Sequence, residues 1–390
     1  MLNKRNILFQ TATILAFSQA LVASAADAPA AKAPPPTYET PRIGLMLQMD
    51  MAAYDDTDQI DNNSGTEMRR GRFSFSGKLE DQFNYRLEIE MFGSSGSEIT
   101  DAYIRYNTSS QSNITFGHFK IPFSLEQTMS DKTLVFMERS LGNSFLKSRA
   151  PGLMFSSYDK SWSAAAMLFG EQLYNKTDTD EGGGFSTRLT WAPYQQNNTV
   201  LHAGISAQFV LPSQQTSTIN YRYSTRPESH ITSVKTVDTG LIGSDGDGLT
   251  LLGVEAAAAI DNVLVSAELM QSSFDTDSGD SLSFSAWYIQ ASYTLTGEIR
   301  AYNRKNGTFK GIMPAADGGA WEVGMRYSEI DLNEDSISGG LERNLTLAVN
   351  YSMNPYIRIS ANWVHVISID EGPYDGEEVD ALQMRFQFIY

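Results

Sequence analysis

The sequence predicts an all-β protein, a 16-stranded antiparallel transmembrane β-barrel. Three observations lead to this prediction: short segments in which apolar and polar residues alternate, a high aromatic content, and connections that are alternately short and long. The 390 residues include 18 Tyr, 20 Phe, 5 Trp and 30 Gly, and 41% of them are hydrophobic. A chain of this length usually forms two or three soluble domains, but this composition favours one large β structure.

The N-terminus is typical of an exported protein. Two basic residues precede an apolar run over residues 7–23, and the small residues before Ala26 fit a cleavage site. We therefore predict a signal peptide over 1–25 and a Pro/Ala-rich periplasmic lead-in over 26–41. An uncleaved anchor is the alternative, although two glutamines interrupt a run that is shorter than the ~20 residues of a membrane helix.

Composition also limits the chemistry of the protein. No cysteine is present, which excludes disulfides and thiolate catalysis. The net charge of −17 becomes −19 once a signal peptide with two basic residues is removed, which argues against nucleic acid as a partner. The four His residues lack metal-ligand spacing and no Gly-x-Ser-x-Gly motif occurs, so we expect no cofactor and no enzymatic activity.

Alternation begins near Ile43 and continues to the last residue. In residues 83–91 the odd positions are apolar or aromatic and the even positions are Asn, Arg or Glu, and the final segment 381–390 alternates in the same way. Side chains at i and i+2 share one face of a strand, so each segment has one apolar and one polar face. This is typical of a barrel with lipid outside and water inside. A secreted β-sandwich is the soluble alternative, and it would need polar outward faces.

The segments number sixteen, an even number as barrels of this kind require. They are expected near residues 43–54, 70–79, 83–93, 99–107, 113–119, 152–158, 162–170, 184–192, 199–210, 249–260, 263–272, 282–296, 319–328, 343–352, 356–367 and 379–390. Short turns lie in the periplasm and long loops outside in such barrels, so both termini are predicted to be periplasmic. The aromatic residues at the C-terminal end would lie at the membrane interface, and the outer surface would contact outer-membrane lipid and lipopolysaccharide.

Charge is unevenly distributed along the chain. Residues 55–68 contain five acidic and no basic residues and 368–380 contain six and none, which indicates either a solvated face or a carboxylate rim that gathers divalent cations. Residues 120–150 hold five basic and three acidic residues, and 297–318 hold four and two. These two segments, if folded into the lumen, would form an electropositive constriction that focuses anions. Ordinary ion pairing with wall carboxylates is the alternative.

The stretch ITFGHFKIPFSLEQTMSDK (114–132), with FMERSL (136–141), resembles the phosphate-selective porin O and P family. The likeness continues in 184–193, 291–298, 319–331 and the final strand, so it covers nearly the whole mature chain. The resemblance implies a homotrimer of 16-stranded barrels. It also implies that the third loop folds into each pore and that inward arginines draw anions toward a narrow binding zone.

The functional positions of the family match this chain only in part. The arginine pair that opens the second strand matches Arg69 and Arg70, the fifth-loop arginines match Arg222 and Arg226, and a third-loop serine that contacts phosphate matches Ser130. The resemblance therefore implies that the electrostatic approach for anions is kept.

Four other matched positions differ. The serine next to the phosphate-contacting one is replaced by Asp131, and three lysine positions fall on Gln127, Asn303 and Met313. Each lost lysine removes a charge-assisted donor, and Asp131 adds a negative charge. The resemblance thus implies an altered selectivity site that binds phosphate weakly.

We expect an outer-membrane porin of a Gram-negative bacterium that lets small hydrophilic solutes diffuse passively, with a bias toward anions such as phosphate or other oxyanions. The expected pore-lining and anion-binding residues are Arg69, Arg70, Arg72, Arg222, Arg226, Ser130, Lys120 and Lys132. One alternative is a general or cation-tolerant porin in which Glu88, Glu90 and Asp131 neutralise the arginines. The other is a structural or adhesive surface barrel with a plugged lumen.

Overall fold

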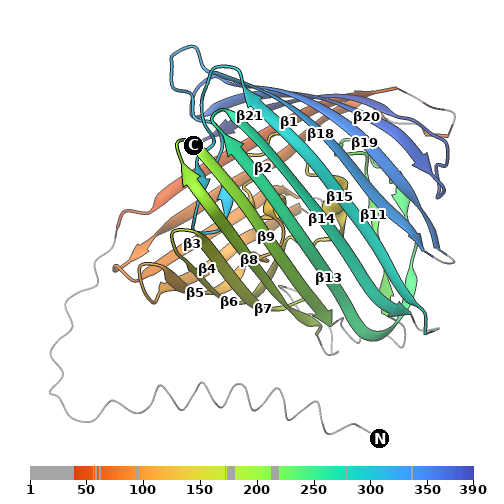
Figure 1. The fold of residues 1–390 in the computed structure, drawn as a ribbon, viewed down its shortest axis with the longest axis horizontal. Coiled ribbons are helices and arrows are strands. Elements are labelled where there is room, and N and C mark those ends of the chain that lie inside the picture. The colour runs from red at the N-terminus through yellow and green to blue at the C-terminus, as the bar shows by residue number, and fades with distance from the viewer. Residues whose placement is uncertain are drawn as a thin grey trace, which may run out of the picture. The chain divides into compact units, whose positions relative to one another are not determined.

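The computed structural model describes residues 39–55, 57, 59–60, 63–93, 96–171, 173, 181–211, 219–276, 279–334 and 337–390. The predicted signal peptide and most of the predicted lead-in lie outside the described residues. The remainder forms a closed barrel of tilted antiparallel strands (Figure 1). No helix among the described residues is long and apolar enough to cross a membrane.

All sixteen predicted strands are present. They are β1 (Arg42–Tyr54), β2 (Gly65–Leu79), β3 (Phe83–Gly93), β4 (Gly96–Asn107), β5 (Ser112–Lys120), β6 (Arg149–Tyr158), β7 (Trp162–Gly170), β8 (Gly183–Gln196), β9 (Thr199–Leu211), β13 (Ile242–Ile260), β14 (Val263–Thr276), β15 (Ser281–Thr294), β18 (Ala320–Glu334), β19 (Ile337–Ser352), β20 (Ile357–Asp370) and β21 (Asp380–Ile389). Each pairs with its neighbours in the wall, and the pairing of β1 with β21 closes the barrel.

Short elements lie in the connections between these strands. The strand β10 (Ile219–Tyr221) pairs with β13, and two small hairpins are formed by β11 (Ser224–Thr225) with β12 (Val237–Asp238) and by β16 (Tyr302–Asn303) with β17 (Thr308–Phe309). The helical turns α2 (Leu125–Thr128) and η1 (Leu141–Phe145) both belong to the connection between β5 and β6.

Both chain ends of the barrel lie together. The backbone N–H groups of Leu45 and Tyr390 each donate to the other residue's carbonyl, at N–O distances of 3.0 and 2.9 Å. We call the end of the barrel that carries Arg42 and Tyr390 the terminal end and the opposite end the loop end. Tight turns such as 197–198 and 261–262 lie at the terminal end, and Asn197, Asn198 and Asp261 adopt the positive φ angles that two-residue hairpin turns require.

Several strands extend further toward the loop end than predicted. The strand β2 begins at Gly65 instead of residue 70, and β13 begins at Ile242 instead of residue 249. The hairpin of β18 and β19 continues to Glu334 and Ile337. A strand that crosses a membrane has only ~9 to 11 residues in lipid. The apolar alternation ends at the edge of this lipid-facing part, whereas the backbone pairing continues beyond the lipid. The alternation therefore predicted the lipid-facing part of each strand more accurately than it predicted where the strands end.

The predicted direction of the two strand faces is confirmed in β21. Leu382, Met384 and Phe386 are 58%, 43% and 44% exposed on the outside, whereas the alternating residues Gln383, Arg385 and Gln387 are buried. Apolar side chains thus face lipid, and polar side chains face the interior.

The interior is not uniformly polar, which the sequence analysis did not predict. Inward residues of β14, β15 and β18, among them Phe274, Phe284 and Ile330, form one buried apolar cluster with Phe123 and Phe145 of the β5–β6 connection. Tyr223 and Val237 of the β9–β13 connection belong to the same cluster. One side of the barrel interior is therefore filled by packed apolar side chains.

Candidate pore and its basic cavities

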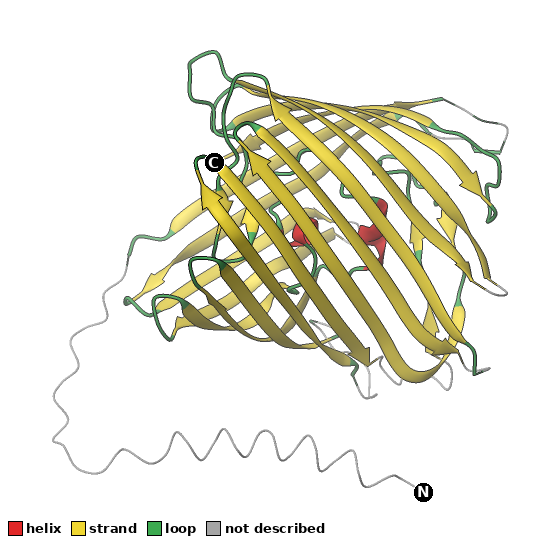
Figure 2. Cartoon of the chain, viewed as in Figure 1, coloured by secondary structure: helices red, strands yellow, loops and turns green. Residues whose placement is uncertain are grey.

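The connection between β5 and β6, residues 121–148, which we call the inner segment, contacts the wall around most of its circumference. It leaves and rejoins the wall where Lys120 pairs with Arg149. Its backbone N–H or C=O groups, or its side chains, hydrogen-bond to polar residues of β1, β2, β8, β9, β14, β18, β19, β20 and β21. Figure 2 shows its two helical turns, in red, within the ring of strands.

The first helical turn of the inner segment is fixed at its N-terminus. Ser124 Oγ accepts a hydrogen bond from Gln127 N at 3.1 Å, and the Glu268 carboxylate accepts from Leu125 N and Glu126 N at 2.9 and 2.8 Å. These bonds satisfy N–H groups that a helix cannot satisfy itself. A wall carboxylate of β14 thus holds the start of the inner segment in place.

A β-bulge in β2 brings two consecutive arginines to the interior. The register with β1 passes from Gln48 opposite Arg70 to Met49 opposite Met68, so Arg69 is an extra residue without a partner in the ladder. In a regular strand, neighbouring side chains point to opposite faces, but a bulge re-aims one of them. Arg69 and Arg70 therefore both reach carboxylates of the inner segment.

Glu138 of the inner segment joins three wall arginines. Arg69 Nε and Nη2 donate to its two oxygens at 2.9 and 3.0 Å, and Arg385 Nη2 donates at 2.8 Å. Arg70 Nη2 lies 3.9 Å from Glu138 Oε2. Burial alone would raise the pKa of the Glu138 carboxyl, but the arginines outweigh burial and hold this pKa well below its usual value.

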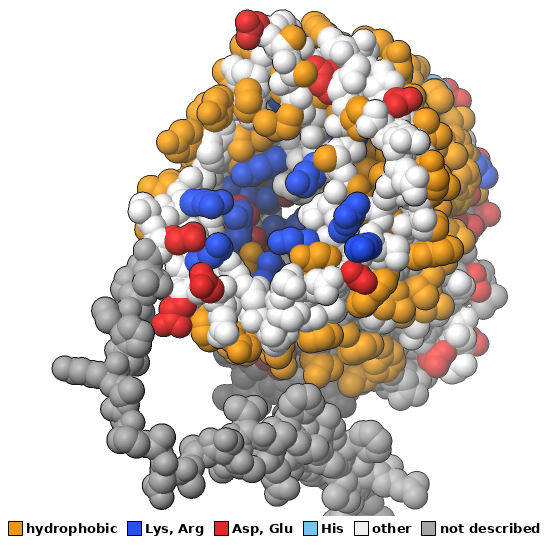
Figure 3. Space-filling view, turned by 60° about the vertical axis from the view of Figure 1, so that its left-hand side comes forward, with side chains coloured by type: hydrophobic (Ala, Val, Ile, Leu, Met, Phe, Trp, Pro, Cys, Tyr) orange, Lys and Arg blue, Asp and Glu red, His pale blue; other side chains and the backbone are white. Residues whose placement is uncertain are grey.

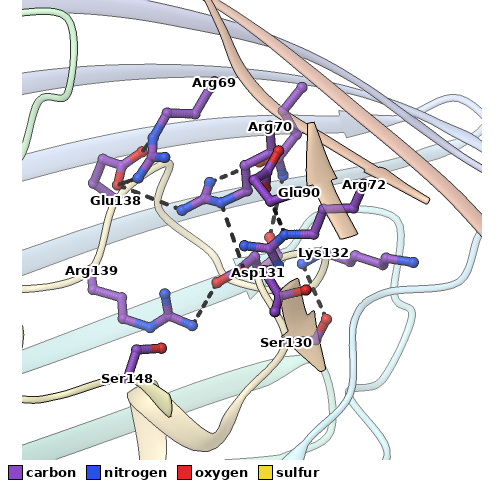
Figure 4. Close-up of polar contacts among 12 residues, drawn as sticks. Arg69, Arg70, Arg72, Glu90, Ser130, Asp131, Lys132, Glu138, Arg139 and Ser148 are labelled. Carbon is purple, nitrogen blue, oxygen red and sulfur yellow. Dashed lines mark hydrogen bonds and ion pairs between the residues drawn. The ribbon is translucent and has the colours of Figure 1, made fainter. Parts of the chain in front are cut away.

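Asp131 likewise forms ion pairs with several guanidinium groups. Its oxygens lie 2.6 Å from Arg72 Nη1, 2.7 Å from Arg139 Nη2 and 3.8 Å from Arg70 Nε. Burial would raise the pKa of Asp131, but the arginines and Lys120 hold it well below the usual value. We call Arg69, Arg70, Arg72, Arg139 and Arg385 the arginine cluster; Figure 4 shows four of them around Asp131 and Glu138.

A cavity of about 1020 Å³ lies at the terminal end, between the inner segment and residues 297–315. Eight basic residues line it against five acidic ones: Arg72, Arg86, Lys120, Lys132, Arg149, Arg300, Lys310 and Arg358 against Glu88, Asp101, Asp131, Glu298 and Glu322. Figure 3 shows Lys and Arg side chains gathered around a hollow in one end of the barrel. We call this space the terminal-end cavity.

The cations of the terminal-end cavity differ in their partners. Arg86 and Arg149 pair with Asp101 at 3.0 Å, and Arg300 pairs with Glu322 at 2.8 Å. Lys120 Nζ donates to the carbonyl oxygens of Gln127 and Met129 at 2.8 and 2.7 Å.

Besides Lys120, three cations of this cavity have no carboxylate within ion-pair distance among the described residues: Lys132, Lys310 and Arg358. Arg358 Nη2 donates only to the carbonyl oxygen of Val135, at 3.3 Å. Burial lowers the pKa of Lys132, although Glu88 and Asp131 act in the opposite direction. These three side chains carry positive charge that no described carboxylate within 4 Å neutralises.

The connection 295–319 closes part of the terminal end. Arg188 of β8 donates to the carbonyl oxygens of Asn306 and Gly307 at 2.6 and 2.9 Å, and Arg300 donates to Thr133 O of the inner segment at 2.9 Å. Two of its cations that line the cavity therefore differ: Arg300 pairs with Glu322 and fixes the connection, whereas Lys310 has no described carboxylate within 4 Å.

The structure brings most of the predicted site residues to the interior, in two groups. Arg69, Arg70 and Arg72 belong to the arginine cluster. Ser130, Lys120 and Lys132, together with Arg72, line the terminal-end cavity.

The two fifth-loop arginines lie apart from both groups. Arg226 lines a second cavity of about 250 Å³ with Arg69, Arg139 and Lys235. Arg222 has an exposed side chain, pairs with Asp238 at an Nε–Oδ1 distance of 2.8 Å, and lines neither cavity.

Sequence reasoning missed four residues of the arginine cluster and the terminal-end cavity: Glu138, Arg139, Arg358 and Arg385. Arg358 and Arg385 occupy polar positions in alternating strands, so the pattern placed them on the inner face without a role. Glu138 and Arg139 were only counted within a basic segment. Identifying them required the contacts of that segment.

An apolar outer surface, a closed wall, the start of β1 beside the end of β21 and basic cavities inside define a porin of the Gram-negative outer membrane. This class agrees with the sequence prediction, and the particular family can be stated as well. The chain belongs to the phosphate-selective porin O and P family, whose sequence profile matches residues 42–390.

Relatives and solved structures agree with this assignment. Porin O of Pseudomonas aeruginosa is 22% identical over 395 residues, covering 90% of this chain and 88% of that protein. An uncharacterized protein of Caulobacter vibrioides is 27% identical over 315 residues; the match covers 77% of this chain but 62% of that protein's length. The solved anion-selective porin from Comamonas acidovorans shares the fold, with a TM-score of 0.57 at 12% identity, over 90% of this chain and 99% of that one.

Proposed function

We propose that this porin is a passive channel, not an enzyme, which lets small hydrophilic solutes diffuse with a bias toward anions such as phosphate or other oxyanions. The observation that carries the proposal is the terminal-end cavity, in which basic residues outnumber acidic ones by eight to five. Four of its cations, Lys120, Lys132, Lys310 and Arg358, lack a carboxylate within ion-pair distance among the described residues. Positive walls of low dielectric concentrate anions and repel cations.

We further propose that the inner segment acts as an inward-folded third loop that sets the bore. Its contacts with nine strands support a fixed position inside the wall. An ion passing such a constriction exchanges water for fixed dipoles and charges. Arg69, Arg70, Arg72, Lys120, Ser130 and Lys132 then act along the path. Arg226 acts in the second cavity, and Arg222 stays a weaker candidate because it is exposed and paired.

Phosphate should be held only weakly. Asn303 and Met313, which occupy family lysine positions, line the terminal-end cavity without a positive charge. Gln127 is buried and cannot donate an ionic bond. Lys132 and Lys310 stand at the same cavity and supply part of the missing charge, so the channel keeps an anion bias without a tight site.

The assembly is proposed from the family alone. We propose a homotrimer whose outer surface contacts outer-membrane lipid and whose acidic outer loops lie beside lipopolysaccharide. No nucleic-acid partner is expected at a net charge of −17. Cross-linking of the detergent-extracted protein tests the trimer directly.

A general or cation-tolerant porin is the second candidate, and one observation favours it. Asp131 and Glu138 neutralise much of the arginine cluster, as Asp131 was expected to do in that alternative. The reversal potential of a planar bilayer under a KCl gradient decides between the two. We expect a potential of the sign that chloride preference gives. A potential of the opposite sign contradicts the anion bias, and the absence of any conductance indicates a plugged barrel.

A further inference from the structure

Resting on the proposed function, we propose that Asp131 and Glu138 are specificity-determining residues of the channel. Their carboxylates occupy the arginine cluster in the place of a solute oxyanion and thereby set how weakly the channel holds anions. The ligand class with which they compete is the oxyanion, whether inorganic phosphate, sulfate or a small carboxylate.

The first support is the geometry at Glu138. Arg69 donates from Nε and Nη2 to both oxygens at 2.9 and 3.0 Å, and Arg385 adds a third bond at 2.8 Å. Arginine binds a free carboxylate or phosphate in the same way, with two parallel N–H groups that donate to two oxygens. A solute oxyanion would need these same donors, so it cannot bind Arg69 while Glu138 does.

The second support is the geometry at Asp131. Its two oxygens are divided between Arg72 at 2.6 Å and Arg139 at 2.7 Å, with Arg70 at 3.8 Å. Arg72 is also held by the wall carboxylate Glu90 at 2.8 Å. One side of this guanidinium is thus satisfied by the wall and the other by the inner segment.

Both carboxylates are tethered at their binding positions. The carbonyl oxygen of Glu138 accepts from Arg326 Nη1 and Nη2 at 3.2 Å, that of Met137 accepts from Arg385 at 2.5 Å, and that of Asp131 accepts from Gln48 at 3.4 Å. A group tethered beside its partner acts at a high effective concentration. A free anion must displace it and therefore binds less tightly than the count of arginines implies.

Neutralising either carboxylate should release the donors. Within the described residues, the cluster of five arginines would keep only one carboxylate of the inner segment, in addition to Asp50 on Arg385 and Glu90 and Glu88 on Arg72. An oxyanion that takes the vacated position would form one or more charge-assisted hydrogen bonds. Oxyanion affinity is therefore expected to rise, while the apolar packing of the inner segment is unchanged.

The test compares E138Q and D131N with the wild type, because the amides keep the shape and remove the charge. Block of the single-channel chloride current by inorganic phosphate is measured in planar bilayers. Each variant should be blocked at a phosphate concentration lower by about tenfold, as expected for one gained charge-assisted bond. The control E378Q removes one charge from an exposed position of the loop between β20 and β21 and should behave as wild type.

A double variant separates competition from a general charge effect. If Glu138 acts by occupying Arg69, then R69Q in the E138Q background should reverse most of the gained phosphate affinity. The conservative variant E138D, which keeps the charge, should stay close to wild type. Heat-modifiable migration in detergent checks the folding of each protein. If E138Q does not fold, the comparison of D131N with the wild type still tests the proposal.

Three outcomes would overturn the inference: unchanged phosphate block in the folded amide variants, an equal gain in E378Q, or a gain that persists in full when Arg69 is also removed. A wild-type channel that prefers cations would contradict the proposed function instead. If the wild type prefers anions but the amide variants do not differ from it, only the role of Asp131 and Glu138 is contradicted.

Discussion

The arginine cluster and the terminal-end cavity are both basic, but their charges are satisfied in different ways. Each arginine of the cluster has a carboxylate within 4 Å, supplied by the inner segment, the wall or both. Lys132, Lys310 and Arg358 in the terminal-end cavity have none among the described residues. Basic residues that look alike in the sequence thus divide into those that fix the inner segment and those that remain available to solutes.

The largest effect is expected from adding charge to the terminal-end cavity. The double variant N303K/M313K places lysines at two cavity-lining positions. Each new charge-assisted bond to phosphate stabilises the bound ion, so block of the chloride current should shift to concentrations at least about tenfold lower. Single-channel recording with increasing phosphate measures this shift.

A control with one lysine added outside the cavities accompanies that variant. Ser110 lies exposed in the turn between β4 and β5 and lines neither cavity, so S110K adds charge away from the path. Equal block in N303K/M313K and in wild type would show that solutes do not bind in the terminal-end cavity. It would contradict a functional difference between this cavity and the arginine cluster.

Removing the unpaired lysines should have the next largest effect. In K132Q/K310Q the cavity loses two positive charges that no near carboxylate balances. The anion-to-cation permeability ratio should fall by about fivefold, because a charged side chain near the path changes the electrostatic energy of a passing ion by ~1 kcal/mol in water. The reversal potential under a KCl gradient gives the ratio, and R222Q, at an exposed residue paired with Asp238, is the control.

Removing arginines of the cluster should have a smaller effect in the same direction. In R69A/R70A, Glu138 keeps Arg385 and Asp131 keeps Arg72 and Arg139, so the exposed negative charge is partly compensated. We expect a fall of about threefold in the permeability ratio. A larger fall than in K132Q/K310Q would reverse the order of the two regions and show that the paired arginines dominate selectivity.

The smallest effect concerns alkaline pH. Burial lowers the pKa of Lys132, so this residue loses its charge at a lower pH than an ordinary lysine, whose pKa is about 10.4. Glu88 and Asp131 favour its charged form, whereas Arg86 and Arg72 oppose it. The anion preference should decline, by less than about twofold, as pH rises toward 10. In K132R the decline should be weaker, since arginine stays charged.

The wall of the barrel could be predicted from sequence because its rule is local. Alternation with period two, as in residues 83–91, needs only neighbouring positions, and all sixteen strands were found. The arginine cluster needed contacts between distant positions: Glu138 and Arg385 are 247 residues apart. The bulge at Arg69 and the apolar interior at Phe274 also depend on packing that no periodicity records.

The resemblance to the porin family supplied part of what periodicity could not. It selected Arg69, Arg70 and Ser130, all of which the structure places in the interior. It also selected Arg222, which the structure places at an exposed position. Where this chain departs from the family pattern, as at Asp131 and Met313, a resemblance cannot show which new contacts replace the old ones.

The position of Glu138 has a consequence for how the barrel assembles. Arg385 belongs to the last strand and Arg69 to the second, so the two lie on either side of the seam where β1 meets β21. The same arginine of β21 also pairs with Asp50 of β1 at 2.7 Å. Glu138 can hold both arginines only after the first and last strands have met. Docking of the inner segment and closure of the wall therefore stabilise one another, and a chain that lacks its final strand loses the native anchorage of a segment more than two hundred residues upstream.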